Sequence, residues 1–454
     1  MTHHDRARQR AIADTLMGEY LEGRLDRRQL LSRAALLGVS MPALTTAFWA
    51  RNPGRAAAQE ATPNVQLGNY EGRTLRMSVA LAEDEAQVFE DVVINGFEEM
   101  TSGEIELIKI EAPDVIRTLE AQVSSGNIEL DLLAQDNNSL APLVNQQLVE
   151  PIEDAEQIIP PETIEDLLPV LQFDNSYYFL PARPNVQITY YNSRVFDEYG
   201  LQPPRTWDEL MSVAQQIREQ AGVGKVSIQG EPPGPVGVTV TQFLWQAGGD
   251  PLQIDTEEAA TAFQFMQDLK PYLTPQYPTA TFDTTNTYLL NESVVLAQNW
   301  PFGVNVIVQE GGKTEVLTYE GWSGPAGNFL VLGGDVFGIV RGSPNKDMAL
   351  DFARYFMSRE IQETLTARLG WPAIRNDAFG AVEEWQQPYF ETVLAALQNV
   401  RARPNVTYWL QVEQVLADAF NDIVTNGAEV ASTLQRYQEQ ITQFQAEAGT
   451  PTAG

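Results

Sequence analysis

The stretch Arg73–Ile110, RTLRMSVALAEDEAQVFEDVVINGFEEMTSGEIELIKI, decides the fold. It begins with apolar residues at every second position, such as Leu75 and Met77, which is typical of a strand with one buried face. Residues 83–102 then repeat apolar side chains every three or four positions, which is the period of an amphipathic helix. The alternation returns in residues 104–110. A strand, a helix and a second strand in this order indicate a β-α-β unit.

The same alternation of elements continues along the chain. Residues 113–127 have a helical period, residues 128–136 are typical of a buried strand, and residues 138–152 predict a third helix. The succession predicts a parallel, doubly wound α/β sheet, and such sheets bind ligands beyond the carboxyl ends of their strands. Because α/β elements recur after an extended segment at residues 180–187, we expect a second lobe of this class and a cleft between the two.

The composition excludes several classes of site. The chain has 454 residues, of which 61 are acidic, 29 basic, two histidine and none cysteine. Both histidines lie in the first 58 residues, so the remainder offers no imidazole base, no Ser-His-Asp triad, no cysteine nucleophile and no zinc site of His or Cys. Oxygen-ligated metals stay possible, but we expect no metal and no cofactor. The acidity opposes binding to nucleic acid or anionic lipid, and solubility alone explains it.

Residues 1–58 have the features of an export signal. They contain nine arginines and no lysine, and Arg27 and Arg28 are followed closely by two leucines, a pattern that resembles a twin-arginine (Tat) signal. The apolar segment 34–50 is short for a membrane-spanning helix, and Ala58 ends a run of small residues that fits a cleavage site. The alternatives are a retained, uncleaved anchor and an amphipathic N-terminal helix of a cytoplasmic protein. An exported product would work in the periplasm or at the cell surface, without a lipid anchor on cysteine.

A second glycine-containing stretch, Leu332–Met357, does not match a nucleotide loop. Its glycines precede an apolar run instead of opening a helix, and no Gly-Lys-Ser/Thr follows, which excludes a dinucleotide fingerprint and a P-loop. We expect a strand that approaches a ligand or the opposite lobe through its glycines. We then expect a helix capped by Ser343 with Pro344 at its first position. The buried stripe of this helix would consist of Met348, Phe352 and Phe356.

The order of four segments resembles the family 1 extracellular solute-binding proteins of ABC importers, the group that includes maltose- and oligosaccharide-binding proteins. The segments are ITYYNSRVFDEYGLQPPRTWDEL, FLWQAGGDPL, GGDVFGIVRGSPNKDMALDFARYFMS and LGWPAIRND. Each alone is weakly specific, but their order extends over nearly all of residues 73–445. The resemblance implies a class II periplasmic binding protein-like fold, in which two doubly wound α/β lobes enclose a ligand cleft at the hinge.

The resemblance also implies a domain organisation and a function. Residues 59–72 would be a linker, lobe 1 would comprise residues 73–183 and 317–358, and lobe 2 residues 184–316 and 359–448. The chain would be a monomeric, non-enzymatic substrate-binding subunit that delivers a sugar or oligosaccharide to an ABC permease and its ATPase. The Tat translocase would be its partner during export. The alternatives are a binding protein for a cationic solute such as a polyamine, an exported glycoside hydrolase, and a structural or adhesive protein.

A sugar site needs aromatic planes for the apolar faces of the rings and carboxylates, amides or guanidinium groups for the hydroxyls. We therefore select aromatic residues beside glycine or proline and polar residues that follow strands. The alternatives are helix capping for the acids, core packing for the tryptophans and surface ion pairs for the arginines. The candidate ligand contacts are Glu83, Asp84, Asp136, Asn137, Arg183, Asn185, Trp245, Gly249, Asp250, Trp300, Phe302, Trp322, Gly334, Asp335, Trp371 and Arg375.

Overall fold

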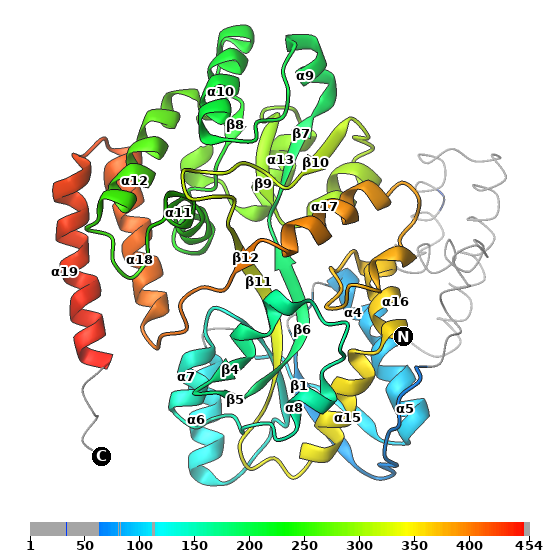
Figure 1. The fold of residues 1–454 in the computed structure, drawn as a ribbon. Coiled ribbons are helices and arrows are strands. Elements are labelled where there is room, and N and C mark those ends of the chain that lie inside the picture. Colours follow the sequence, from blue (N-terminus) through cyan, green and yellow to red (C-terminus); the bar gives the residue numbers. More distant parts are fainter. Residues whose placement is uncertain (1–32, 34–62, 80, 82, 111–113, 449–454) are drawn as a thin grey trace.

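The computed structural model describes residues 33, 63–79, 81, 83–110 and 114–448. It has two halves, each built on its own sheet (Figure 1). The expected export signal, with Arg27, Arg28 and Ala58, lies outside the described residues. Within the described part of the chain, no helix has both the length and the apolar character needed to cross a membrane.

The lower half is built on a six-stranded sheet with the order β12-β11-β3-β1-β2, in which β6 also pairs with β11. β1 runs parallel to β2 and to β3, as the β-α-β pattern predicts. β11 is antiparallel to both β3 and β6, so the sheet is mixed. The strands are β1 (Thr74–Ser78), β2 (Glu104–Leu107), β3 (Leu132–Asp136), β6 (Phe179–Val186), β11 (Leu330–Ile339) and β12 (Val400–Arg401).

Helices cover this sheet and bury its apolar side chains. They are α4 (Glu83–Phe89), which continues through a π-helical turn (Glu90–Ile94) into α5 (Asn95–Thr101), and α6 (Val115–Ser125), α7 (Leu140–Asn145), α8 (Ala155–Ile158), α15 (Lys346–Phe356) and α16 (Arg359–Leu369). The predicted stripe of Met348, Phe352 and Phe356 is buried. Phe337 of β11 meets Phe356 edge to face, with ring centroids 5.0 Å apart. A small hairpin of β4 (Gln172–Phe173) and β5 (Ser176–Tyr177) lies at the side.

The predicted start of α15 was wrong by two residues. The helix begins at Lys346 with Asn345 as its N-cap, not with Ser343 as the cap and Pro344 at the first position. The Ser343 hydroxyl instead donates to the Asp131 carboxylate at 2.8 Å and accepts the Asn345 N–H at 3.1 Å. A buried carboxylate needs donors, and this requirement recruits the hydroxyl into a turn ahead of the helix.

The upper half is built on a four-stranded sheet with the order β10-β7-β9-β8. Its strands are β7 (Ile188–Asn192), β8 (Val226–Ser227), β9 (Leu296–Asn299) and β10 (Val316–Tyr319). Its helices are α9 (Ser193–Tyr199), α10 (Trp207–Ala221), α11 (Gly234–Ala247), α12 (Glu257–Leu269), α13 (Phe282–Leu290), α14 (Phe302–Val304), α17 (Gln387–Leu397), α18 (Trp409–Phe420) and α19 (Val430–Ala448). Thr206 caps α10, because its hydroxyl accepts the Glu209 N–H at 3.2 Å.

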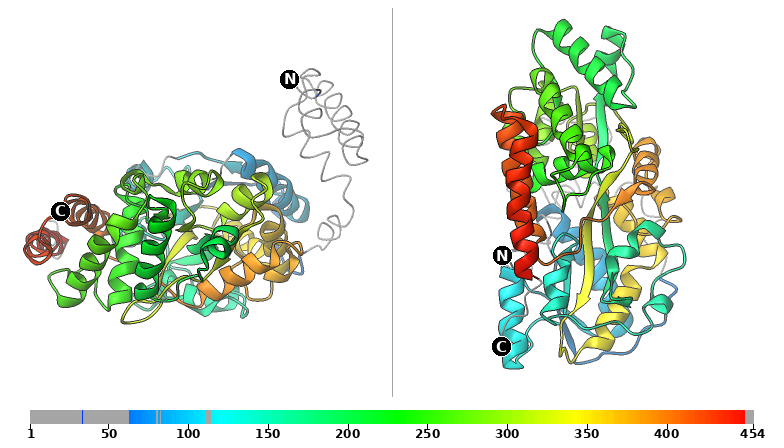
Figure 2. Two further views of the ribbon diagram at one scale, coloured as in Figure 1. Left: turned by 90° about the horizontal axis from the view of Figure 1, so that it is seen from above. Right: turned by 60° about the vertical axis from the view of Figure 1, so that its left-hand side comes forward.

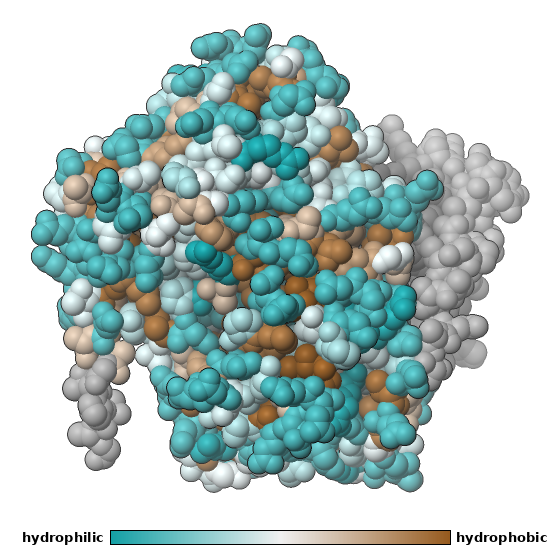
Figure 3. All heavy atoms as spheres, in the orientation of Figure 1, coloured by the Kyte–Doolittle hydropathy of each residue, from teal (hydrophilic) through white to brown (hydrophobic). Residues whose placement is uncertain are grey.

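The chain passes between the halves more than once. It crosses where β6 joins β7, in residues 320–329, and again in residues 402–408. Figure 2 shows β11 running from one half towards the other, with α19 on an outer flank. Apolar side chains gather on the visible face at the waist between the halves (Figure 3). Repeated crossings are the connectivity of a hinged pair of lobes.

Two glycines of β11 allow the halves to meet. Gly334 has a φ of +99°, and a Cβ there would overlap the carbonyl oxygen of Arg183 on the paired strand β6. A Cβ on Gly333 would lie 2.7 Å from the ring of Trp300, which follows β9 of the upper half. The absent side chains therefore permit both the β6–β11 pairing and the contact between β11 and the upper half.

We predict that Gly334→Ala destabilises the protein more than a matched change elsewhere. Gly126 also has a positive φ, +72°, but a Cβ there would enter open space. The control Gly126→Ala should lower the free energy of unfolding by about 1–2 kcal/mol, the cost of a left-handed conformation. Gly334→Ala adds a backbone clash and should cost clearly more. Urea unfolding of both variants measures the difference, and equal losses would contradict the role given to Gly334.

Candidate functional site

Polar side chains gather where the central strand of the lower sheet ends. β3 ends at Asp136, and the buried Asn137 follows it. The Asn137 N–H donates to the carbonyl oxygen of Gly334 at 3.0 Å, and Asp335 lies opposite Asp136 in the β3–β11 ladder. Four of the predicted residues, Asp136, Asn137, Gly334 and Asp335, therefore come together at the edge where α/β sheets bind ligands.

Arg183 of β6 joins this edge to an aromatic side chain. Its guanidinium forms ion pairs with Asp335 at 2.9 Å and with Glu85 at 3.6 Å. Its Cζ lies 4.5 Å from the ring centroid of Trp371, and the Trp371 indole N–H donates to Glu85 at 2.7 Å. Arg183 and Asp335 are 23% and 13% exposed, so this cluster is only partly open to water.

The charges around Asp335 act against one another. Burial raises the pKa of the Asp335 carboxyl, and the guanidinium of Arg183 lowers it. The carboxylates of Asp136 and Glu85 raise the pKa of Asp335 again. Excess negative charge at this edge therefore favours a ligand that offers hydroxyl or ammonium hydrogens.

A second arginine, Arg403, also belongs to this network. It lies in residues 402–408, where the chain crosses between the halves for the last time. The Nη2 of Arg403 donates to the side-chain oxygens of Asp136 at 3.1 Å and Asn137 at 2.9 Å. Its Nη1 lies 3.7 Å from the carboxylate of Glu413 on α18. Arg403 thereby links the end of a lower strand to a helix of the upper half.

Aromatic side chains form a cluster of their own beside this network. Its buried members are Val238 and Trp245 of α11, Trp300, and Val331 of β11, with Phe282 and Phe329 packed against them. The rings of Phe282 and Trp300 meet edge to face at 5.6 Å. The Tyr190 hydroxyl of β7 donates to the Trp300 carbonyl at 2.9 Å and fixes its backbone. Phe302, two residues on, is 36% exposed.

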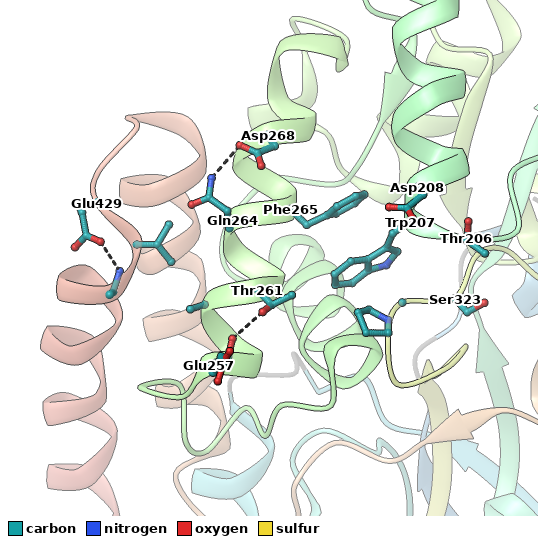
Figure 4. A pocket seen from close by; sticks show the side chains of 15 residues that line it. Thr206, Trp207, Asp208, Glu257, Thr261, Gln264, Phe265, Asp268, Ser323 and Glu429 are labelled. Carbon is teal, nitrogen blue, oxygen red and sulfur yellow. Dashed lines mark hydrogen bonds between the residues drawn. The ribbon is translucent and has the colours of Figure 1, made fainter.

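A cavity of about 760 Å³ lies elsewhere (Figure 4). Its walls are the N-terminus of α10, the helix α12, the start of α19 and the turn at Ser323–Pro325. The three helices belong to the upper half. Trp207 and Phe265 stack at 4.5 Å in its wall. The carboxylate of Glu429 in this wall already accepts the N–H groups of Ala431 and Ser432. A ligand there would touch one half only, whereas the network above joins both.

Comparison with known proteins identifies the family. The bacterial extracellular solute-binding protein family matches residues 93–392 of this chain. The chain belongs to this family. The arabinooligosaccharide-binding protein of Halalkalibacterium halodurans is 23% identical over 384 residues, which cover 79% of this chain and 84% of that protein.

Solved structures of solute-binding proteins share the fold. Maltose-bound MalE3 of T. maritima superposes with a TM-score of 0.71 at 22% identity, covering 82% of this chain and 100% of that one. The cyclic alpha-maltosyl-1,6-maltose binding protein of Arthrobacter globiformis gives a TM-score of 0.70 at 21% identity, covering 82% and 98%. The predicted periplasmic binding protein-like fold is thus confirmed.

Several predicted residues lie apart from the charged network and the aromatic cluster. Trp322 is fully buried in the core of the upper half. Asp250, next to Gly249, is exposed, and its carboxylate accepts the Leu252 N–H in a turn. Arg375 binds Asp377 and Glu162 within the lower half.

Three further candidates lie on β6 and α4 of the lower half. Asn185 pairs with Gly333 across the β6–β11 ladder and accepts the Val186 N–H with its own side chain. Glu83 and Asp84 begin α4, but their side chains are outside the described part of the structure.

Sequence reasoning missed Glu85, Arg403 and Glu413. Arg403 contacts Asp136 and Asn137, which precede it by 267 and 266 positions in the chain. No local sequence pattern predicts a contact between segments so far apart. The available signal was weak: Arg401 and Arg403 form an Arg-x-Arg pair in a chain with only 29 basic residues. Arg401 also stacks on Phe329, with its Cζ 3.3 Å from the ring centroid.

We predict that Arg183→Lys destabilises the protein although it preserves the charge. A lysine cannot stack its head on Trp371 while bridging two carboxylates, so the free energy of unfolding should fall by about 1–2 kcal/mol. Arg205 offers a matched control, because it also lies over a ring, Tyr319, and pairs with Glu320, but is 61% exposed. Arg205→Lys should change stability by less than about 0.5 kcal/mol. Chemical denaturation of both variants tests this, and similar losses would argue against a special role for Arg183.

Proposed function

We propose that this protein is the extracytoplasmic substrate-binding subunit of an ABC importer and binds a sugar or oligosaccharide in the cleft between its halves. The supporting observation is that the aromatic cluster around Trp300 adjoins the network of Asp136, Arg183 and Asp335. Phe302, two residues beyond Trp300, adds an exposed ring. Sugar rings present apolar faces and hydroxyl edges, so one ligand can use both surfaces. The names of the relatives support the same class, since they bind arabinooligosaccharide, maltose and a cyclic maltosyl-maltose.

The proposed mechanism is closure of the halves on the solute. Asp136 and Asn137 belong to a lower strand, whereas Phe302 follows a strand of the upper sheet. A solute that contacts both sets stabilises the closed arrangement and shifts the population towards it. The permease would recognise that arrangement, and its ATPase would drive transport, so this chain would carry out no chemistry.

Of the sixteen candidates, we retain those that border the cleft as proposed ligand contacts. They are Asp136, Asn137, Arg183, Asn185, Trp245, Trp300, Phe302, Gly334, Asp335 and Trp371, together with Glu83 and Asp84 at the start of α4. The other candidates serve a turn, a core or a structural ion pair in the described residues.

The two halves are the proposed lobes, and their boundaries differ from the expectation in β12 (Val400–Arg401), which pairs with β11 of the lower sheet, and in two further elements. β10, at Val316–Tyr319, pairs with β7, which favours the upper lobe for this segment. α16, at Arg359–Leu369, contacts α4, which favours the lower lobe. These differences follow from packing that joins segments distant in sequence.

Export is proposed from the leader alone. Arg27 and Arg28 in a twin-arginine pattern, followed by an apolar segment and the small residues up to Ala58, support passage through the Tat translocase. Folding would then precede export. We further propose that the mature protein acts as a monomer outside the cytoplasmic membrane.

A cationic solute is the second candidate function. Four carboxylates, Glu85, Asp136, Asp335 and Glu413, surround two guanidinium groups, and carboxylates with aromatic rings also suit ammonium groups.

A glycoside hydrolase receives less support. Glu413 has the raised pKa of a general acid, but it is only 3% exposed and lies behind Arg403.

We predict that a saccharide raises the melting temperature of the mature protein. A ligand that binds only the folded state at 100 times its dissociation constant adds about 2.7 kcal/mol to stability. A thermal-shift screen over arabino- and malto-oligosaccharides, polyamines and peptides measures this directly. Stabilisation by polyamines with none from any saccharide would replace the sugar assignment by the cationic one.

We predict that Phe302→Ala weakens binding of the stabilising saccharide by about threefold to tenfold, because it removes an exposed ring worth about 0.5–1.5 kcal/mol. Stability should hardly change. Leu317 on β10 is a matched control, since it is 37% exposed against 36% for Phe302. Leu317→Ala should leave the affinity unchanged in isothermal titration calorimetry, and equal effects of the two changes would refute a role for Phe302.

A further inference from the structure

Asn305 lies where a turn of the upper half touches the lower half. It begins a π-helical turn, Asn305–Glu310, that directly follows α14 and Phe302. A Cβ on Gly370, the C-cap of α16 in the lower half, would lie 2.8 Å from the side-chain nitrogen of Asn305. The missing side chain of Gly370 therefore lets this amide reach the lower half. π-helical turns are rare and are frequently found at functional sites.

The side-chain oxygen of Asn305 is buried without a hydrogen-bond partner. Its Oδ1 accepts no hydrogen bond from any residue that the structure describes. Buried polar atoms are normally paired, because an unpaired one loses its hydrogen bonds to water and gains none in return. This oxygen therefore needs a donor that the described part of the chain does not supply.

Arg183 carries the complementary atom on the lower half. Its terminal nitrogens pair with Asp335 and Glu85, but its Nε is buried and donates to no residue in the described ranges. Its guanidinium lies over the ring of Trp371, at 4.5 Å from the centroid, and Trp371 directly follows Gly370 in the chain. An unpaired acceptor of the upper half and an unpaired donor of the lower half are thus both adjacent to this pair of consecutive residues.

We propose that Asn305 is a solute contact of the upper half, and that its Oδ1 and the Nε of Arg183 together recognise the hydroxyl groups of a sugar unit. A hydroxyl both donates and accepts, so hydroxyls can give a hydrogen to Asn305 and receive the Nε hydrogen of Arg183. An ammonium group only donates, and its charge repels the guanidinium. The pair therefore selects a saccharide over a cationic solute. The assignment rests on the proposed binding function and deepens it.

The melting temperature of the unliganded protein provides the first test. Asn305→Ala should leave it unchanged or raise it, because the amide oxygen has no hydrogen bond to lose within the described residues. Gln267 is the matched control, since it is partly buried like Asn305 but its amide donates to the carbonyls of Ile423 and Ala428 at 2.8 and 3.1 Å. Gln267→Ala should lower the melting temperature. Equal losses in the two variants would show that the Asn305 amide is already paired, which would overturn the proposal.

Isothermal titration calorimetry with maltotriose, arabinotriose and spermidine provides the second test. Asn305→Ala should weaken binding of the trisaccharide that binds by about tenfold, the effect of one lost hydrogen bond to a buried group. Gln267→Ala should leave that affinity unchanged. An unchanged affinity in Asn305→Ala, or spermidine binding that Asn305→Ala weakens, would contradict recognition of a hydroxyl.

Monodeoxy analogues of the same trisaccharide identify the hydroxyl that Asn305 contacts. Removal of that hydroxyl should weaken binding to the unsubstituted protein by about tenfold and have no further effect in Asn305→Ala, because the two changes remove the same interaction. Losses that simply add at every position of the sugar would refute the contact. Failure of the proposed function has a different signature, which is that no saccharide binds the unsubstituted protein. Failure of this inference alone appears as saccharide binding that Asn305→Ala does not alter.

Discussion

The arrangement of the molecule depends on how closely β11 approaches its neighbours. This strand pairs with β3 on one side and β6 on the other, and Gly333-Gly334 lies where it also meets Trp300 of the upper half. A side chain at either glycine would displace a backbone or a ring. The carbonyl of Gly334 then receives the N–H of Asn137, so the strand that joins the halves also orients the edge where the cleft residues lie.

The charged network at that edge determines geometry more than stability. Buried ion pairs lose solvation that their attraction only partly restores, so their net contribution to stability is small. Removing one partner is costly, however, because a charge is left without compensation. Arg183 and Arg403 each have carboxylates as partners from segments far apart in sequence. The network therefore specifies which surfaces meet, and its surplus of carboxylates suits a ligand that offers hydrogen-bond donors.

The fold and the ligand are separate questions for this family. Solved structures of similar fold contain maltose, alpha-D-tagatose, acarbose or ribitol as ligands. Specificity must then come from side chains and not from the sheets, and we propose Phe302 and Asp335 among them. The cavity of the upper half illustrates the distinction, since its size is sufficient for a ligand but it lacks contact with the second lobe.

The sequence by itself determined the class of fold, because apolar periodicity is a local property: the β-α-β pattern of residues 73–136 and the stripe of α15 are visible without coordinates. It also placed Asp136 and Asn137 correctly after a strand. The tertiary structure alone decided which candidates meet. Trp322 and Trp371 both stand beside glycine in sequence, yet one is enclosed in a core and the other stacks on Arg183. The partnership of Arg403 with Asp136 and Glu413 could not be predicted, since it arises from the crossing of distant segments and the burial of charge that follows.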